Sequence, residues 1–86
     1  MQKGQRKTSL IDIQVGSRLR QAREKWGISQ QEIGDLLTPP VTFQQVGKYE
    51  SGANRISASS LFRIAQKTQH PMEWFFTVED SNVGQG

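Results

Sequence analysis

The sequence predicts an all-α domain made of five short helices. Apolar residues recur at spacings of three and four along most of the chain, which is the period of a helix that buries one face. Serine, threonine, glycine and proline stand where these stretches would begin or end. No stretch alternates polar and apolar residues over the length of a strand, so no sheet is expected.

The first helix is expected to begin at Asp12, whose carboxylate can accept a hydrogen bond from the first turn. It is expected to end at Gly27, because glycine often follows a helix C-terminus. Its apolar residues form one stripe along the helix: Val15, Leu19, Ala22 and Trp26.

A second helix is expected to start at Ser29, which forms an S-x-x-E capping box with Glu32. Pro39 disfavours helical backbone at the preceding residue and should stop the helix at Thr38. The apolar face of this helix consists of Ile33, Leu36 and Leu37.

Thr42 can cap a third helix, and Gln45 completes a T-x-x-Q box with it. Val46 and Tyr49 lie three residues apart and should face inward. Gly52 ends this helix. The two capped helices, joined by a turn, follow the plan of a helix-turn-helix motif.

Ser57 or Ser59 would cap a fourth helix, and Pro71 suits the first turn of a fifth. The fourth helix carries Leu61, Ile64 and Ala65, and the fifth carries Met72, Trp74, Phe75 and Phe76. Adjacent residues of a helix point in different directions, so the aromatic cluster cannot face the core as a whole. We therefore expect a dimer face in this segment, formed by Met72, Trp74 and Phe75.

Both ends of the chain have few apolar residues. Residues 1–9 are expected to form a flexible basic arm and residues 79–86 a disordered tail, which leaves 10–78 as the folded domain. The arm could follow phosphates or enter a minor groove of DNA, as basic arms do in other proteins. It could equally be a disordered terminus without a role.

Composition excludes several classes of protein. The chain has 86 residues, no cysteine and a single histidine, His70, so we expect no disulfide, no metal site and no cofactor. No apolar run reaches the ~20 residues of a membrane span. The polar start MQKGQRKTSL lacks the apolar core of a secretion signal. We expect a cytoplasmic protein without a membrane partner, and a lone histidine in a turn does not indicate an enzyme.

The charge of the chain is unevenly distributed around a net value of +3 at pH 7. Residues 1–25 hold seven Lys and Arg against two acids, a balance of +5. Residues 71–86 hold three acids and neither Lys nor Arg, a balance of −3. A basic front half suits a polyanion such as nucleic acid, although an ordinary solvated surface could carry the same net charge.

The start of the third helix carries side chains suited to reading DNA. In the major groove an amide can bond adenine N6 and N7 together, and lysine can donate to guanine. Gln44 and Lys48 lie four residues apart and share one face, where Gly47 would let the backbone approach closely. The alternative is a solvated surface helix without a partner.

Two stretches resemble the DNA-binding domain of Xre/Cro/phage-repressor-type helix-turn-helix regulators. They are GSRLRQAREKWGISQQEIGDLL and VTFQQVGKYESGANRISASSLFRIAQ, and the likeness runs from about residue 15 to 77. Its markers are L-R-x-x-R-E at 19–24, G-I-S-Q at 27–30, Y-E-x-G at 49–52 and L-x-x-I-A at 61–65. The resemblance implies a five-helix lambda-repressor-like domain that binds double-stranded DNA, usually as a symmetric dimer, and regulates transcription.

The resemblance also implies roles for individual residues. Base contacts would come from Phe43, Gln44, Gly47 and Lys48, with Gln45 at the margin of that face. Phosphate contacts would come from Gln30, Thr42, Asn54 and Arg55. A structural ion pair would join Arg23 to Glu50, the only acid of the third helix.

The turn of the motif departs from the family pattern. Thr38, Pro39 and Pro40 make it about two residues longer than usual and also stiff, so the docking angle of the third helix could differ. Phe43 could touch a thymine methyl group, or it could pack on Pro40 or Leu37.

Taken together, these patterns predict a sequence-specific transcriptional regulator of bacterial or phage type that binds a palindromic operator as a homodimer. Bound to DNA, it would be associated with the nucleoid. An alternative from another class is an antitoxin or adaptor module that uses the same fold to bind a protein partner of unknown identity.

Overall fold

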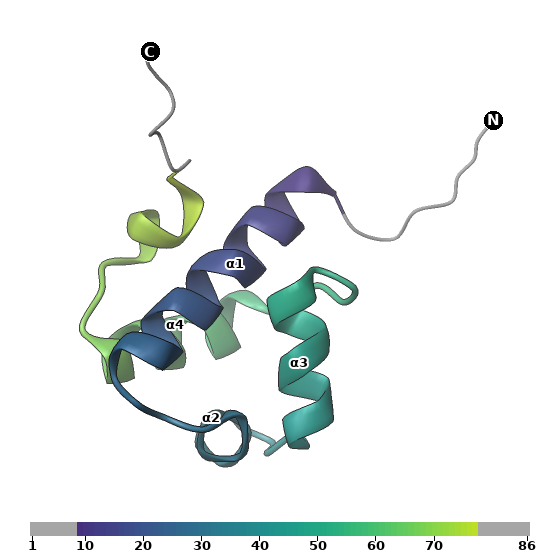
Figure 1. Cartoon of the computed structure of the whole chain (residues 1–86), viewed down its shortest axis with the longest axis vertical. Coiled ribbons are helices and arrows are strands. Elements are labelled where there is room, and N and C mark those ends of the chain that lie inside the picture. Colours follow the sequence, from purple (N-terminus) through teal and green to yellow (C-terminus); the bar gives the residue numbers. More distant parts are fainter. Residues whose placement is uncertain (1–8, 78–86) are drawn as a thin grey trace, which may run out of the picture.

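The computed structural model describes residues 9–77, which form four α-helices and one 3-10 helix and contain no strand. The elements are α1 (Leu10–Lys25), α2 (Gln30–Leu36), α3 (Phe43–Ser51), α4 (Ala58–Thr68) and η1 (Met72–Phe76) (Figure 1). The all-α class is confirmed. The expected tail lies outside the described residues, and so does the expected arm except for Ser9.

Where a fifth α-helix was expected, the chain forms the 3-10 helix η1. This segment is only five residues long and lies between Pro71 and Thr77. The backbone N–H of Trp74 bonds the carbonyl of Pro71 at 3.0 Å, and that of Thr77 bonds the carbonyl of Trp74 at 3.3 Å. Bonds of this i to i+3 type suit short segments.

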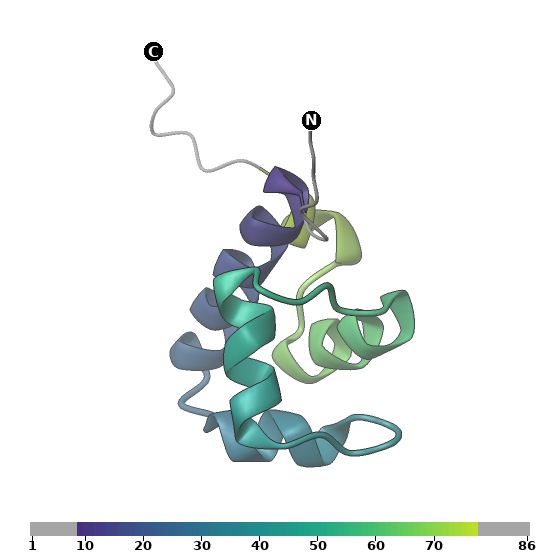
Figure 2. The same cartoon turned by 90° about the vertical axis from the view of Figure 1, so that its right-hand side faces the viewer.

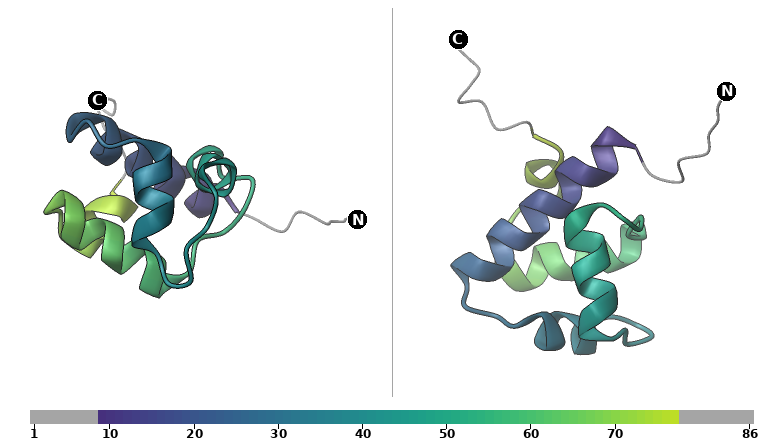
Figure 3. Two further views of the ribbon diagram at one scale, coloured as in Figure 1. Left: turned by 90° about the horizontal axis from the view of Figure 1, so that it is seen from below. Right: turned by 45° about the vertical axis from the view of Figure 1, so that its right-hand side comes forward.

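Helix α3 packs against both α1 and α2, and η1 packs against α1. In Figure 1, α2 is seen end-on while α3 runs along the page, and the left view of Figure 3 shows the reverse, so these two helices point in different directions. Helix α4 lies behind α1 in Figure 1. Figure 2 shows that no other described element covers the outward side of α3.

The core is one cluster of apolar side chains drawn from all five elements and the α1–α2 turn. Its members are Val15, Leu19, Ala22, Ile28, Ile33, Leu37, Val46, Leu61, Ile64, Ala65 and Phe75. The assignment of Trp26 to the apolar stripe was wrong, because α1 ends at Lys25 and the Trp26 side chain is 44% exposed. After the turn at Gly27, whose φ is +66°, Ile28 enters the core instead.

The start of α1 lies earlier than expected. Its N-cap is Ser9, whose hydroxyl accepts the backbone N–H of Asp12 at 3.3 Å. Asp12 in turn accepts the backbone N–H of Ser9 at 2.7 Å, so the two residues form a capping box. The prediction that Asp12 is the N-cap is therefore wrong, since Asp12 occupies the third position of the helix.

The caps of the other helices agree more closely with the sequence. Ser29 and Glu32 form the expected capping box, and Ser57 rather than Ser59 caps α4. Thr42 Oγ1 accepts the backbone N–H of Gln45 at 3.1 Å. The side chain of Gln45 does not return to Thr42, so this box is only half formed.

Two glycines allow close contact between elements. A Cβ atom on Gly16 would collide with the carbonyl oxygen of Tyr49, so this glycine lets α1 approach the end of α3. A Cβ atom on Gly34 would collide with the carbonyl oxygen of Val41. The carbonyl of Gly34 also accepts the backbone N–H groups of Leu37 at 3.3 Å and Val41 at 3.1 Å. The α2–α3 connection is therefore held against α2 from both of its ends.

The segment around η1 is attached to α1 by polar and aromatic contacts. The carbonyl of Thr77 accepts from Gln14 Nε2 at 2.6 Å and from Arg18 Nε at 3.3 Å. The Arg18 guanidinium lies 4.6 Å from the ring centre of Trp74, which also stacks on His70 at 3.9 Å. Burial of His70, together with nearby Lys25 and Arg18, lowers the pKa of its imidazole. No helix among residues 9–77 has the length and apolar character to cross a membrane.

Candidate nucleic-acid interface

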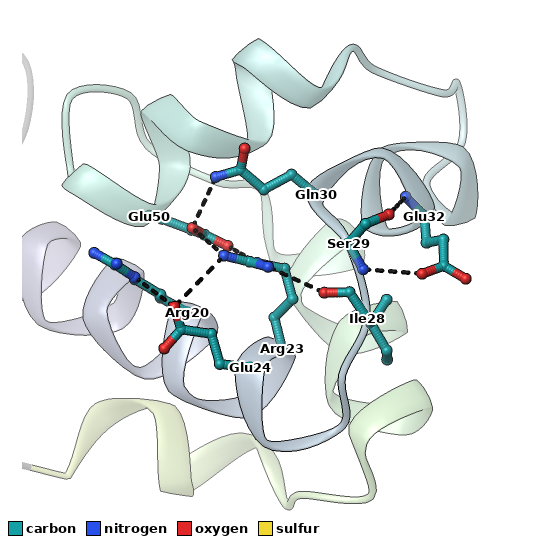
Figure 4. Close-up of polar contacts among 8 residues, drawn as sticks. All are labelled: Arg20, Arg23, Glu24, Ile28, Ser29, Gln30, Glu32 and Glu50. Atoms are coloured by element: carbon teal, nitrogen blue, oxygen red, sulfur yellow. Dashed lines mark hydrogen bonds and ion pairs between the residues drawn. The ribbon is translucent and has the colours of Figure 1, made fainter.

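The side of α3 that faces α1 and α2 is anchored by an ion pair between Arg23, which is partly buried, and Glu50, which is buried. Arg23 Nε lies 2.6 Å from Glu50 Oε2, and Arg23 Nη2 lies 3.3 Å from Oε1, so the pair is bidentate (Figure 4). The Glu50 side chain is only 5% exposed. The third nitrogen of Arg23 donates to the carbonyl of Ile28 at 3.0 Å. One guanidinium therefore joins α1, the α1–α2 turn and α3.

Gln30, at the start of α2, joins the same group. Its Nε2 donates to Glu50 Oε1 at 3.1 Å, which fixes the direction of the side chain (Figure 4). The resemblance implies a phosphate contact for Gln30, and its bond to Glu50 is an additional finding. Both can hold, because a carboxamide nitrogen carries two hydrogens and only one is needed for Glu50.

The outward side of α3 differs in character from the anchored side. Gln44 and Lys48 are exposed, and the side chain of neither makes a hydrogen bond or an ion pair within residues 9–77. Phe43 is 48% exposed at the first position of the helix. Gly47 lies between them and is partly buried. This face therefore offers donors and acceptors that are not used within the described part of the chain.

The margin of α3 is tied to the loop that follows it. Gln45 Nε2 donates to Asn54 Oδ1 at 3.0 Å, and the backbone N–H of Asn54 bonds the carbonyl of Lys48 at 3.1 Å. The resemblance implies a position for Gln45 at the margin of the proposed base contacts and a phosphate contact for Asn54. The structure brings the two side chains together.

Arg55 reaches back to the start of α1. Its Nε lies 3.3 Å from Asp12 Oδ1 and 3.2 Å from Oδ2, which ties the loop after α3 to the first turn of α1. The pKa of Asp12 is lowered, first by the hydrogen bond from the backbone of Ser9 and further by Arg55. Local sequence patterns do not predict this contact, because 43 residues separate its partners.

The aromatic residues near the C-terminal end divide between the core and the surface. Phe75 is fully buried in the core of its own chain, so its assignment to a dimer face was wrong. Trp74 and Met72 are partly buried against that core. Phe76, which was left out of the expected dimer set, is 50% exposed. Since only one of two successive residues can point inward, Phe76 takes the outward place.

Residues 9–77 contain no group of three or more His, Cys, Asp or Glu side chains placed to hold a metal ion. Apart from the buried carboxylate of Glu50, the polar side chains described above around α3 are amides, a hydroxyl, guanidinium groups and an ammonium group. These are donors to phosphate oxygens and to the base edges of a duplex.

Comparison with known proteins places the same residues in one family. The sequence pattern of the helix-turn-helix family matches residues 19–75. An "Uncharacterized HTH-type transcriptional regulator" of Sinorhizobium medicae (strain WSM419) is 45% identical over 76 residues, which cover 88% of this chain and 53% of the relative. An "Uncharacterized transcriptional regulator in ATPase CF(0) region" of Rhodospirillum rubrum is 42% identical over 67 residues, which cover 78% of this chain and 60% of the relative. The chain thus spans only part of the length of these relatives.

Two solved structures share the fold. The restriction-modification controller protein C.AhdI from Aeromonas hydrophila superposes with a TM-score of 0.67 at 24% identity, covering 79% of this chain and 100% of that one. The BldD DNA-binding domain of S. venezulae superposes with a TM-score of 0.65 at 23% identity, covering 80% and 100%. At these identities the likeness concerns the fold alone.

The buried ion pair can be tested by a double-mutant cycle. Arg23→Met would leave the Glu50 carboxylate buried without its partner and is expected to lower the free energy of unfolding by about 3–5 kcal/mol. The double variant Arg23→Met with Glu50→Leu should recover much of that loss, because no unpaired charge remains. Urea denaturation followed by circular dichroism measures both.

Arg20→Met is the matched control for this cycle. Arg20 pairs with Glu24 at 3.0 Å on the surface, where both side chains are more than half exposed, so its loss should change stability little. An Arg23→Met variant as stable as the Arg20→Met variant would contradict a structural role for the buried pair.

Proposed function

The chain belongs to the Xre/Cro-type helix-turn-helix family, and on this premise we propose that it is a sequence-specific DNA-binding transcriptional regulator. In this proposal α3 enters the major groove of duplex DNA. In the same proposal, the 3-10 helix η1 occupies the position of the fifth helix of a lambda-repressor-like domain. One observation carries the proposal. The side chains of Gln44 and Lys48 are exposed and unbonded within residues 9–77, on a helix whose other side is anchored by Glu50.

The proposed base readers occupy the N-terminal half of α3, the part of a recognition helix that usually reaches the base edges. Gln44 can bond adenine through both atoms of its amide, and Lys48 can donate to guanine O6 or N7. Phe43 offers apolar contact, and Gly47 lets the helix backbone come close. Gln45 is bonded to Asn54 and takes the margin of this set.

Contacts to phosphates would fix the position of α3 without reading sequence. The proposed residues surround α3 from three directions: Gln30 from α2, Thr42 from the connection, and Asn54 with Arg55 from the following loop. Gln30 and Arg55 are held by Glu50 and Asp12. Their side chains are therefore already oriented before DNA binds, which lowers the entropic cost of these contacts.

A homodimer is the assembly that best fits a palindromic operator, with half-sites ~34 Å apart. An apolar hollow lies between three elements: the start of α1, the start of α4, and η1. We propose that the two chains of the homodimer contact each other at this hollow. Its apolar lining includes Ile11, Ile56, Met72 and Phe76. Ile11 is 62% exposed and Phe76 is 50% exposed, so the hollow continues into an uncovered apolar surface.

The same apolar surface favours a second candidate function, an antitoxin or adaptor module that binds another protein. Selection of bound sequences from a pool of random DNA duplexes separates the two. A regulator is expected to enrich one motif with two inverted half-sites. Absence of any enriched motif would reject sequence-specific regulation and leave the protein-binding module as the better explanation.

Gln44→Ala tests the base-reading role of α3. Loss of a bidentate amide contact is expected to weaken binding to the selected duplex by about 1–3 kcal/mol and to relax the preference at one base pair. Fluorescence anisotropy with single-base variants of the duplex measures both effects. Gln66→Ala, on the exposed side of α4, is the control and should leave affinity unchanged.

Gly47→Ala separates folding from DNA contact. A methyl group at this position would lie 3.6 Å from Gln30 Nε2, an ordinary contact, so the fold accommodates it. Replacing a helical glycine by alanine should raise the free energy of unfolding by roughly 0.5–1 kcal/mol. Binding to the selected duplex should nevertheless weaken, because the methyl group keeps the backbone from the bases. Unchanged affinity would show that α3 does not approach DNA at Gly47.

Phe76→Glu tests the homodimer. A charge at this exposed apolar position should prevent self-association and weaken binding to a duplex with two half-sites more than binding to one half-site. Sedimentation velocity gives the oligomeric state. Trp26→Glu places the same charge at the far end of α1 and should leave both properties unchanged. A dimer that persists in Phe76→Glu would move the interface elsewhere.

A further inference from the structure

An open hollow lies beside the start of α3, next to the proposed base reader Gln44. Residues from α2, the α2–α3 connection and α3 line it: Gln31, Pro40, Val41, Thr42, Phe43 and Gln44. Because Gln44 itself lines the hollow, a base pair that Gln44 contacts would lie next to it. The hollow therefore adjoins the surface proposed to meet DNA and is continuous with it.

The walls of the hollow are mainly apolar. Proline, valine and phenylalanine side chains form much of the lining, and no charged side chain takes part. Two of its polar groups are already engaged within the chain. Thr42 Oγ1 accepts the backbone N–H of Gln45 at 3.1 Å, and Gln31 Nε2 donates to Asp35 Oδ1 at 3.1 Å. The lining therefore suits an apolar group as the occupant of the hollow better than it suits a purely polar base edge.

The connection that forms one wall is held in place. Val41 is bonded to the carbonyl of Gly34, and Pro40 has a restricted φ. Phe43, at the first position of α3, also lines the hollow and remains 48% exposed. A small apolar group that enters the hollow would cover part of the exposed phenyl ring. This burial of apolar surface favours binding.

The 5-methyl group of thymine is the one apolar group that a base pair presents in the major groove. We infer that this hollow receives the 5-methyl group of one thymine in each half-site, and that Phe43 thereby sets a preference for thymine beside the base read by Gln44. This inference rests on the proposed function and extends it to the chemistry of one base.

Replacement of thymine by deoxyuridine tests the inference, because the two bases differ only in the methyl group. Each thymine of the selected half-site is replaced in turn, and Kd is measured by fluorescence anisotropy. At one thymine the wild-type chain should bind the uracil duplex roughly fourfold more weakly, the effect of burying about one methyl group. At the other thymines the two duplexes should bind alike.

Phe43→Ala should remove the difference between thymine and uracil at that position, whereas Phe62→Ala should keep it. Phe62 is the matched control because it is 50% exposed on α4 and does not line the hollow. Circular dichroism serves to check that both variants fold. The comparison of thymine and uracil duplexes with the wild-type chain requires no variant.

The outcomes are distinguishable. Equal binding of thymine and uracil duplexes at every position of an enriched motif would overturn the inference and leave the proposed function intact. A thymine preference that survives in Phe43→Ala would place the methyl group elsewhere and would also overturn it. Failure to enrich any motif would reject the proposed function and this inference together.

Discussion

The buried carboxylate of Glu50 is the constraint on which the placement of α3 depends. A carboxylate that is only 5% exposed requires compensation for the loss of water. Arg23 from α1 and Gln30 from α2 supply it through three hydrogen bonds to its two oxygens. Because these donors come from two other helices, the orientation of α3 is fixed relative to both. Hydrophobic contacts alone are less directional and would fix this angle less sharply.

The α2–α3 connection completes this placement from the other end of the helix. Its extra length leaves open a docking angle of α3 that differs from the family pattern, and in this chain the close contact of Gly34 with Val41 holds the connection where α3 begins. The additional residues, Thr38 to Pro40, are exposed beyond this contact. The insertion therefore changes the surface next to α3 while both ends of the helix remain attached to the same scaffold.

Much of this fold follows from local sequence patterns, and its misses have a common cause. Caps such as Ser29 and Thr42 act within four residues, so their roles can be read from spacing alone. Trp26 was misplaced because the periodic pattern continues one residue beyond the point at which α1 stops. Phe75 and Phe76 could not be told apart, since which of two neighbours faces the core depends on how η1 docks on α1. Partners such as Asp12 and Arg55 are distant in sequence and become visible only once the helices are packed.

The polar residues around α3 fall into two groups that suit the two parts of DNA recognition. Gln30, Gln45 and Arg55 are each bonded to another side chain of the domain, whereas Gln44 and Lys48 make no such bond within the described residues. Contacts to phosphates recur at regular positions along any duplex, so side chains oriented in advance can make them at little entropic cost. Base edges differ from site to site, and a side chain without an internal partner loses no hydrogen bond when it meets the correct base. At an incorrect base, the donors of such a side chain would remain unsatisfied in a desolvated groove. This cost is the physical origin of discrimination between bases. In the proposed function, side chains held by internal bonds would position the domain on the phosphates, and the unbonded side chains of Gln44 and Lys48 would contact the bases.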